Sequence, residues 1–263
     1  MKSLLLLLFT TLTLTSCSQT KMSKEDIIET YVTNCAQKHN YNYEMEAWQK
    51  CLDKGLEKDS TIAYLWQQKA MPYFKARKYE VGMKFQDKAV LYDREGQQDY
   101  RAFIKCIFSK NYEDAIADFE DYKKDFGNHY VMDHTYDFYI AISCLQLNQF
   151  EKAEQLLTGY LNDLEKELGE EWLHPTALFY LGVAKMELKK YNEAIIEFDR
   201  ALKIYPEFSD VKYYKSVCLM NLGKKEETKQ TYTEYLEDSK NGFTINEDNV
   251  VYEMYPYQVR QRK

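Results

Sequence analysis

The stretch that decides the fold is PTALFYLGVAKMELKKYNEAIIEFDRALKIYP, residues 175–206. Its apolar residues recur at intervals of three and four, which predicts two short helices, each with one buried stripe. Gly182 and Ala194 are small where these helices should cross, and small side chains let two helix backbones approach closely. Pro206 ends the pair, because proline has no N–H to donate and its ring clashes with the preceding turn.

Eight residues of this stretch occupy the positions of a known repeat motif: Leu178, Leu181, Gly182, Tyr191, Ala194, Phe198, Ala201 and Pro206. In this pattern the stretch resembles the tetratricopeptide repeat (TPR) family. Lys185 departs from the family pattern, in which an aromatic residue is usual at that position. The resemblance implies an all-α fold in which helix pairs stack into a right-handed α-α superhelix.

One helix pair cannot bury its own hydrophobic faces, so further copies are expected at a fixed period. The positions equivalent to Gly182 recur at spacings of 33 to 41 residues, as Ser216, Ala141, Phe103, Ala70 and Ala36. Those equivalent to Ala194 recur as Thr228, Ala153, Ala115, Gly82 and Trp48. About six helix pairs are therefore predicted over residues 25–239. Pro72 falls inside one of the predicted helices, where it should either kink the helix or free a carbonyl.

The chain begins with MKSLLLLLFTTLTLTSC, which is too short an apolar run to span a membrane and predicts a signal peptide over residues 1–16. Leu14-Thr15-Ser16-Cys17 resembles the lipobox of bacterial lipoproteins, in which the cysteine is diacylated through its sulfur. The resemblance implies lipidation of Cys17, with residues 17–24 as a tether. The alternative is an ordinary secretory signal followed by an unrelated cysteine. Ser18 does not resemble an inner-membrane retention signal, which favours the outer membrane, facing the periplasm.

The net charge argues against nucleic-acid binding, and the positions of the cysteines indicate core residues and one possible disulfide. The 263 residues carry a formal net charge of −7, which disfavours nucleic-acid binding. Cys106, Cys144 and Cys218 lie among apolar residues, as small core residues do. Cys35 and Cys51 fall on the two helices of the first pair, close enough for a disulfide that the sequence alone leaves open.

No catalytic constellation, cofactor fingerprint or metal-ligand spacing is found in the sequence. His129 and His134 are five residues apart in a linker, so the histidines are interpreted as surface or loop-capping residues. With 9 glycines there is little material for a phosphate-binding loop. A non-catalytic protein with no metal and no cofactor is therefore expected.

TPR superhelices hold protein or peptide partners on their inner surface, which the first helix of each pair lines. The carboxylate clamp of some family members is absent, because Val183, Ile142 and Val217 replace its usual asparagines. The groove should instead take an apolar peptide or helix, unless the repeats bury this stripe or the C-terminal tail fills it. The residues predicted to line it are Tyr100, Ile104, Ile107, Phe138, Ile142, Leu145, Phe179, Val183, Met186, Tyr213, Val217 and Met220.

Residues 240–263 break the helical pattern and form a predicted tail or cap. The run VVYEMYPYQV is too apolar for a free coil, and partial packing against the last helix pair is favoured. The tail could also fold back into the groove. The predicted function is a non-catalytic interaction or scaffold module, anchored by lipid in the bacterial envelope. The alternatives are a homodimeric structural protein that uses the tail, or an accessory subunit of an envelope enzyme or outer-membrane assembly complex.

Overall fold

The computed structural model describes residues 22–260. The predicted signal peptide, Cys17 and nearly all of the tether therefore lie outside the described residues. No helix in the described range is both long enough and apolar enough to cross a membrane.

Helices make up almost all of the ordered structure, and their order follows the predicted repeats. The α-helices are α1 (Lys24–Ile28), α2 (Met45–Lys58), α3 (Ala63–Lys75), α4 (Tyr79–Tyr92), α5 (Arg94–Phe103), α6 (Tyr112–Phe126), α7 (Tyr136–Gln146), α8 (Phe150–Leu168), α9 (Pro175–Glu187), α10 (Tyr191–Ile204), α11 (Ser209–Asn221) and α12 (Lys225–Lys240). Shorter helical segments are η1 (Glu29–Thr33), η2 (Ala36–Lys38), η3 (Ile104–Phe108) and η4 (Glu170–Trp172).

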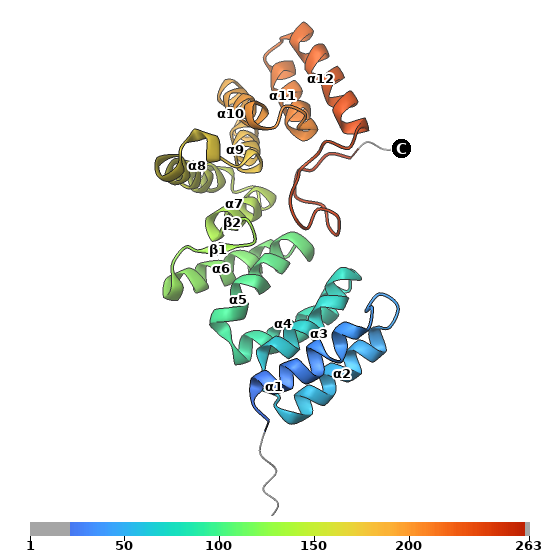
Figure 1. Cartoon of the computed structure of the whole chain (residues 1–263). Coiled ribbons are helices and arrows are strands. Elements are labelled where there is room, and N and C mark those ends of the chain that lie inside the picture. Colours follow the sequence, from blue (N-terminus) through green and yellow to red (C-terminus); the bar gives the residue numbers. More distant parts are fainter. Residues whose placement is uncertain (1–21, 261–263) are drawn as a thin grey trace, which may run out of the picture.

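The helices pack as consecutive pairs, α3 with α4, α5 with α6, α7 with α8, α9 with α10 and α11 with α12. The segments α1, η1 and η2 pack on α2 and complete a first pair. Each pair also packs on the next, so the pairs stack into one curved array (Figure 1). The prediction of six helix pairs is confirmed.

The first pair is less regular than the others. Ser23 caps α1, since its Oγ accepts from the Asp26 backbone N–H at 3.0 Å. The chain then passes through the π-helix η1 and the 3-10 helix η2 and not through one continuous α-helix. A disulfide between Cys35 and Cys51 joins this irregular segment to α2 and settles the pairing that the sequence left open.

Pro72 lies inside α3 without ending it. The proline cannot donate to the carbonyl four residues earlier, that of Gln68. The indole N–H of Trp48, on α2, donates to that carbonyl at 3.1 Å. The freed carbonyl thus becomes a contact between the first and second pairs, which is one of the two outcomes expected for this proline.

The quoted stretch forms α9 and α10, with Gly182 at the crossing point. A Cβ on Gly182 would lie 2.4 Å from Cε1 of Phe198 on α10, so the ring occupies the space that glycine leaves. Phe198 and Ala194 are both fully buried. Cys106, Cys144 and Cys218 are buried free thiols, as predicted from their apolar neighbours.

The linker between α6 and α7 contains the strands that the sequence did not predict. Strand β1 (Tyr130–Val131) pairs antiparallel with β2 (His134–Thr135) in a two-stranded hairpin. The pairing turns the chain so that His134 lies at 0% exposure, immediately before α7. The interpretation of His134 as a surface or loop-capping histidine is therefore wrong.

Candidate functional site

Residues 243–260, called the tail below, run out and back along one side of the array. Figure 1 shows this segment leaving α12, passing α11, α9 and α7, and returning toward α11. That side is called the inner face below. Ile245 and Tyr255 of the tail are buried, with exposed fractions of 1% and 3%. The expected packing against the last pair is present, but the tail extends much further, to the second pair.

Asp210, near the start of α11, closes the base of the tail. Its Oδ2 accepts from the Thr244 hydroxyl at 2.7 Å and from the Ile245 N–H at 3.0 Å. Its Oδ1 accepts from the Val259 N–H at 2.5 Å. Burial raises the pKa of the Asp210 carboxyl, and these hydrogen bonds oppose that effect. One buried carboxylate therefore holds the outgoing and the returning segments of the tail together.

The far end of the tail contacts the second helix pair. The Arg77 guanidinium donates to the Tyr252 carbonyl at 2.9 Å, and the Lys75 ammonium lies 3.4 Å from the centroid of the Tyr252 ring. The Tyr79 hydroxyl donates to the Glu253 carboxylate. The tail thus spans from the sixth pair to the second.

Between these ends the inner face supplies donors to the main chain of the tail. The Lys110 ammonium, in the third pair, donates to the Met254 carbonyl. The Tyr180 hydroxyl, on α9, donates to the Pro256 carbonyl at 2.8 Å. These bonds recognise backbone carbonyls and not particular side chains, which is how a groove holds an extended peptide.

Three side chains with metal-ligating atoms meet where the tail crosses the fourth and fifth pairs. His134 Nε2 lies 3.3 Å from both carboxylate oxygens of Glu247, and His174 Nδ1 lies 3.6 Å from Glu247 Oε1. Glu247 is 5% exposed. Burial lowers the pKa of His174 to about 4. Burial alone would raise the pKa of Glu247, but the hydrogen bond and charge of His134 hold it below its ordinary value.

Sequence reasoning missed this cluster because its members are far apart in the chain. His134 and Glu247 are separated by 113 residues, and the tail had no predicted path. His174 also caps α9, since its Nδ1 accepts from the Thr176 N–H at 3.3 Å, so the loop-capping interpretation holds for that histidine.

The structure places the twelve predicted groove residues in three settings. Met220 is exposed, and Tyr100, Met186, Tyr213 and Val217 are half-buried. The buried members are Ile104, Ile107, Phe138, Ile142, Leu145, Phe179 and Val183. Phe179 packs on Phe198, Phe208 and Tyr214. Their role in binding a partner stays a prediction.

The tail meets the residues next to these positions. Tyr180 follows Phe179 in α9 and holds the Pro256 carbonyl, and Glu187 follows Met186 and accepts from the Tyr257 hydroxyl at 3.1 Å. The neighbouring residue on a helix points about 100° away. The residues that contact the tail therefore lie on a helix face rotated by about 100° from the face predicted to line the groove.

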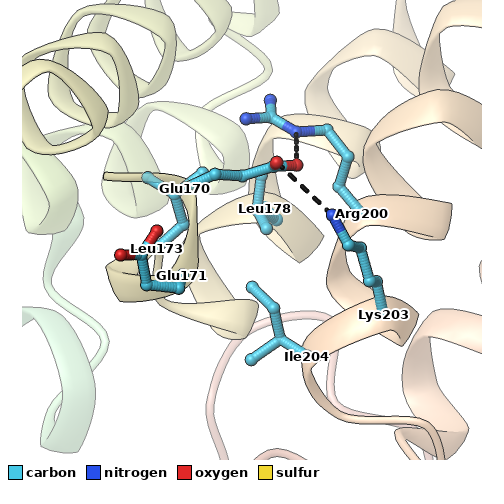
Figure 2. A pocket seen from close by; sticks show the side chains of 7 residues that line it. All are labelled: Glu170, Glu171, Leu173, Leu178, Arg200, Lys203 and Ile204. Atoms are coloured by element: carbon cyan, nitrogen blue, oxygen red, sulfur yellow. Dashed lines mark hydrogen bonds and ion pairs between the residues drawn. The ribbon is translucent and has the colours of Figure 1, made fainter.

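A hollow lies between η4 and α10, apart from the tail, and has a volume of about 340 Å³. Figure 2 shows Glu170 pointing toward Arg200 and Lys203, with Ile204 and Leu178 forming the apolar floor. Lys203 Nζ lies 3.3 Å from Glu170 Oε2, and Arg200 also pairs with Glu165 and Glu197. The positive charges in this hollow are thus already matched by carboxylates of the chain itself.

The array has the fold of TPR proteins. Residues 175–208 match the family model of the tetratricopeptide repeat. The chain is similar to PilW, a widely conserved type IV pilus biogenesis factor, at 15% identity and a TM-score of 0.61, over 82% of this chain and 94% of that one. A tetratricopeptide repeat protein from Parabacteroides merdae gives 12% identity and a TM-score of 0.61, over 85% of this chain and 80% of that one.

YrrB, a TPR protein with an unusual peptide-binding site, is similar at 18% identity and a TM-score of 0.53, over 72% of this chain and 93% of YrrB. No curated protein sequence matches the chain. The predicted fold class, an all-α array of TPR helix pairs, is confirmed.

Proposed function

We propose that this protein is a non-catalytic interaction scaffold of the bacterial envelope, anchored by lipid on Cys17, which binds an extended apolar or aromatic segment of a partner on its inner face. The tail supplies the observation that carries this proposal. It lies on the inner face as an irregular segment with turns at residues 248–253 and 256–257, and its carbonyls accept from Arg77, Lys110 and Tyr180, on three different helix pairs. A face with this chemistry suits a second peptide of similar character.

The tail acts in this scheme as a resident ligand. A partner segment would bind by displacing part of it or by adding to its edge. Aromatic residues supply the apolar part of the contact, since the rings of Tyr214 and Tyr257 meet edge to face with centroids 5.8 Å apart. The inner face thus favours partners that are rich in aromatic residues.

Two observations support the envelope location. The Cys35–Cys51 disulfide fits an oxidising compartment, in which such bonds persist. The lipobox-like sequence ends at Cys17, and residues 17–24 supply a short link to the first helix pair. PilW, which is similar to this chain in fold, is a pilus biogenesis factor. We propose attachment to the outer membrane, facing the periplasm.

The test is site-specific photocrosslinking of the full-length protein in its native envelope. A photoreactive phenylalanine analogue at Tyr214 or Tyr257, whose rings meet on the inner face, should give adducts with other proteins. The same analogue at Tyr43, which is 87% exposed in the first pair, serves as the control. Adducts that form only at Tyr43 would place the partner surface away from the inner face and refute the proposal.

Attachment is tested separately with an alkyne-tagged fatty acid fed to the cells. Wild-type protein should carry the label and remain with the membrane, whereas Cys17→Ser should lose both. Labelling that persists in Cys17→Ser would exclude this cysteine as the lipid site.

A further inference from the structure

We propose that His134, His174 and Glu247 form a binding site for a divalent transition metal of the zinc class, and that the metal fastens the tail to the array. The site goes beyond the proposed scaffold function and stands independently of it. The three residues each offer one ligand atom, and these atoms all lie within 4.8 Å of one another. Two imidazoles and one carboxylate are a ligand set that zinc takes in proteins.

The spacing of the ligand atoms around Glu247 fits a metal as well as it fits the present hydrogen bond from His134. Metal bonds of about 2.0–2.1 Å in a tetrahedral arrangement place neighbouring ligand atoms about 3.3 Å apart. His134 Nε2 lies 3.3 Å from both oxygens of Glu247, and His174 Nδ1 lies 3.6 Å from Oε1. A charge-assisted N–H···O bond is shorter, about 2.7–2.9 Å.

The orientation of His174 also bears on the proposed metal site. Its Nδ1 accepts a hydrogen bond from the Thr176 N–H, so this nitrogen carries a lone pair and not a proton. The same atom faces a carboxylate oxygen of Glu247. A metal on this nitrogen would take the lone pair that now accepts from the Thr176 N–H, so metal binding would replace this 3.3 Å hydrogen bond.

Surrounding groups are arranged as the outer shell of a metal site. The Tyr160 hydroxyl lies 3.2 Å from His134 Nδ1, the nitrogen that would not bind the metal, and fixes the ring orientation. The ring of Tyr139 lies next to that of His134, with centroids 6.1 Å apart, and its buried hydroxyl has no hydrogen-bond partner among the described residues. His174 is 32% exposed in its side chain, which gives an ion a route of entry.

Nearby carboxylates add negative charge. Asp133 and Asp248 are the chain neighbours of His134 and Glu247 and place two more carboxylates beside the cluster. This potential favours a divalent cation. Because Glu247 belongs to the tail while both histidines belong to the array, the metal would cross-link two segments 113 residues apart.

The test uses the tag-free full chain, without additional histidines. Titration with zinc should show one tightly bound equivalent, and cobalt(II) should give the visible absorption of a four-coordinate site. Glu247→Gln and His134→Gln should each weaken zinc binding at least about 10- to 100-fold. Glu253→Gln, in the same tail, and His129→Gln, an exposed histidine, should bind zinc as the wild type does.

A second readout is independent of the variants. Saturating zinc should slow hydrogen exchange at tail residues 245–250 in the wild type, and a chelator should reverse the effect. If a variant loses its helical circular dichroism, the test of the metal site relies on the cobalt spectrum and the hydrogen exchange of the wild-type protein. Absence of a stoichiometric zinc equivalent, or binding that is unchanged in Glu247→Gln, would overturn the proposal, whereas crosslinking at the inner face could still succeed.

Discussion

Replacing Asp210 by asparagine should release the tail while leaving the array folded. The substitution keeps the shape of the side chain but leaves one oxygen where there were two. If that oxygen keeps Thr244 and Ile245, the new amide NH₂ faces the Val259 N–H, whose present acceptor is 2.5 Å away. Two donors then oppose each other in a buried site.

The size of the effect follows from these contacts. A hydrogen bond to a charged group contributes about 1.5–3 kcal/mol, and a buried donor left without an acceptor costs about 1–3 kcal/mol. Because the two terms overlap at Val259, we expect tail closure to weaken by about 2–4 kcal/mol. A tenfold change in population corresponds to about 1.4 kcal/mol, so the open tail should become about 30- to 700-fold more populated.

Hydrogen exchange of the Ile245 and Val250 amides measures this opening, since both N–H groups are bonded in the closed tail. Asp199→Asn is the matched control, because Asp199 is 54% exposed and, within residues 22–260, its ion pair is with Lys215 at the surface. It should leave both amides unchanged. Equal exchange in Asp210→Asn and wild type would refute the assignment of Asp210 as the closure point.

Three further results are expected. Gly182→Ala should lower the unfolding free energy by about 1–3 kcal/mol in denaturant titrations, because its Cβ would meet a buried ring. Gly159→Ala should raise it by about 0.5–1 kcal/mol, because beyond its own helix backbone the new Cβ would have no atom of the described residues within 4 Å. The reverse order of the two effects would contradict the packing. The double variant Cys35→Ser, Cys51→Ser should destabilise the first pair by about 3 kcal/mol, because the disulfide closes a loop with a sequence separation of 16 and so restricts the unfolded chain. Hydrogen exchange of the α2 amides measures the effect. Unchanged exchange would show that the disulfide does not stabilise the first pair. Burial raises the pKa of Cys106 to about 12, so iodoacetamide at pH 8 should modify it only after unfolding; rapid labelling of the native protein would contradict its burial.

The helix pairs were predictable because each is a local pattern. The spacing of apolar residues around Gly182 fixes two helices, and recurrence of that pattern fixes the number of pairs. Such features depend on residues a few positions apart.

Contacts between distant segments were not predictable in the same way. The sequence showed that Pro72 would free a carbonyl or bend α3, but the donor, Trp48, lies on another helix and was known only once the packing was. Glu247 gave no signal, because its partners stand before α7 and α9 and the path of the tail has no periodic pattern.

Photocrosslinking from the tail to the array tests the central claim most directly. The claim is that residues 243–260 lie on the inner face and reach the second helix pair. A benzophenone analogue in place of Tyr252, whose ring lies 3.4 Å from the Lys75 ammonium, should attach within the chain to peptides containing residues 75–79. Adducts confined to residues 209–240, or formed only between two chains, would contradict this path of the tail and the peptide-binding face inferred from it.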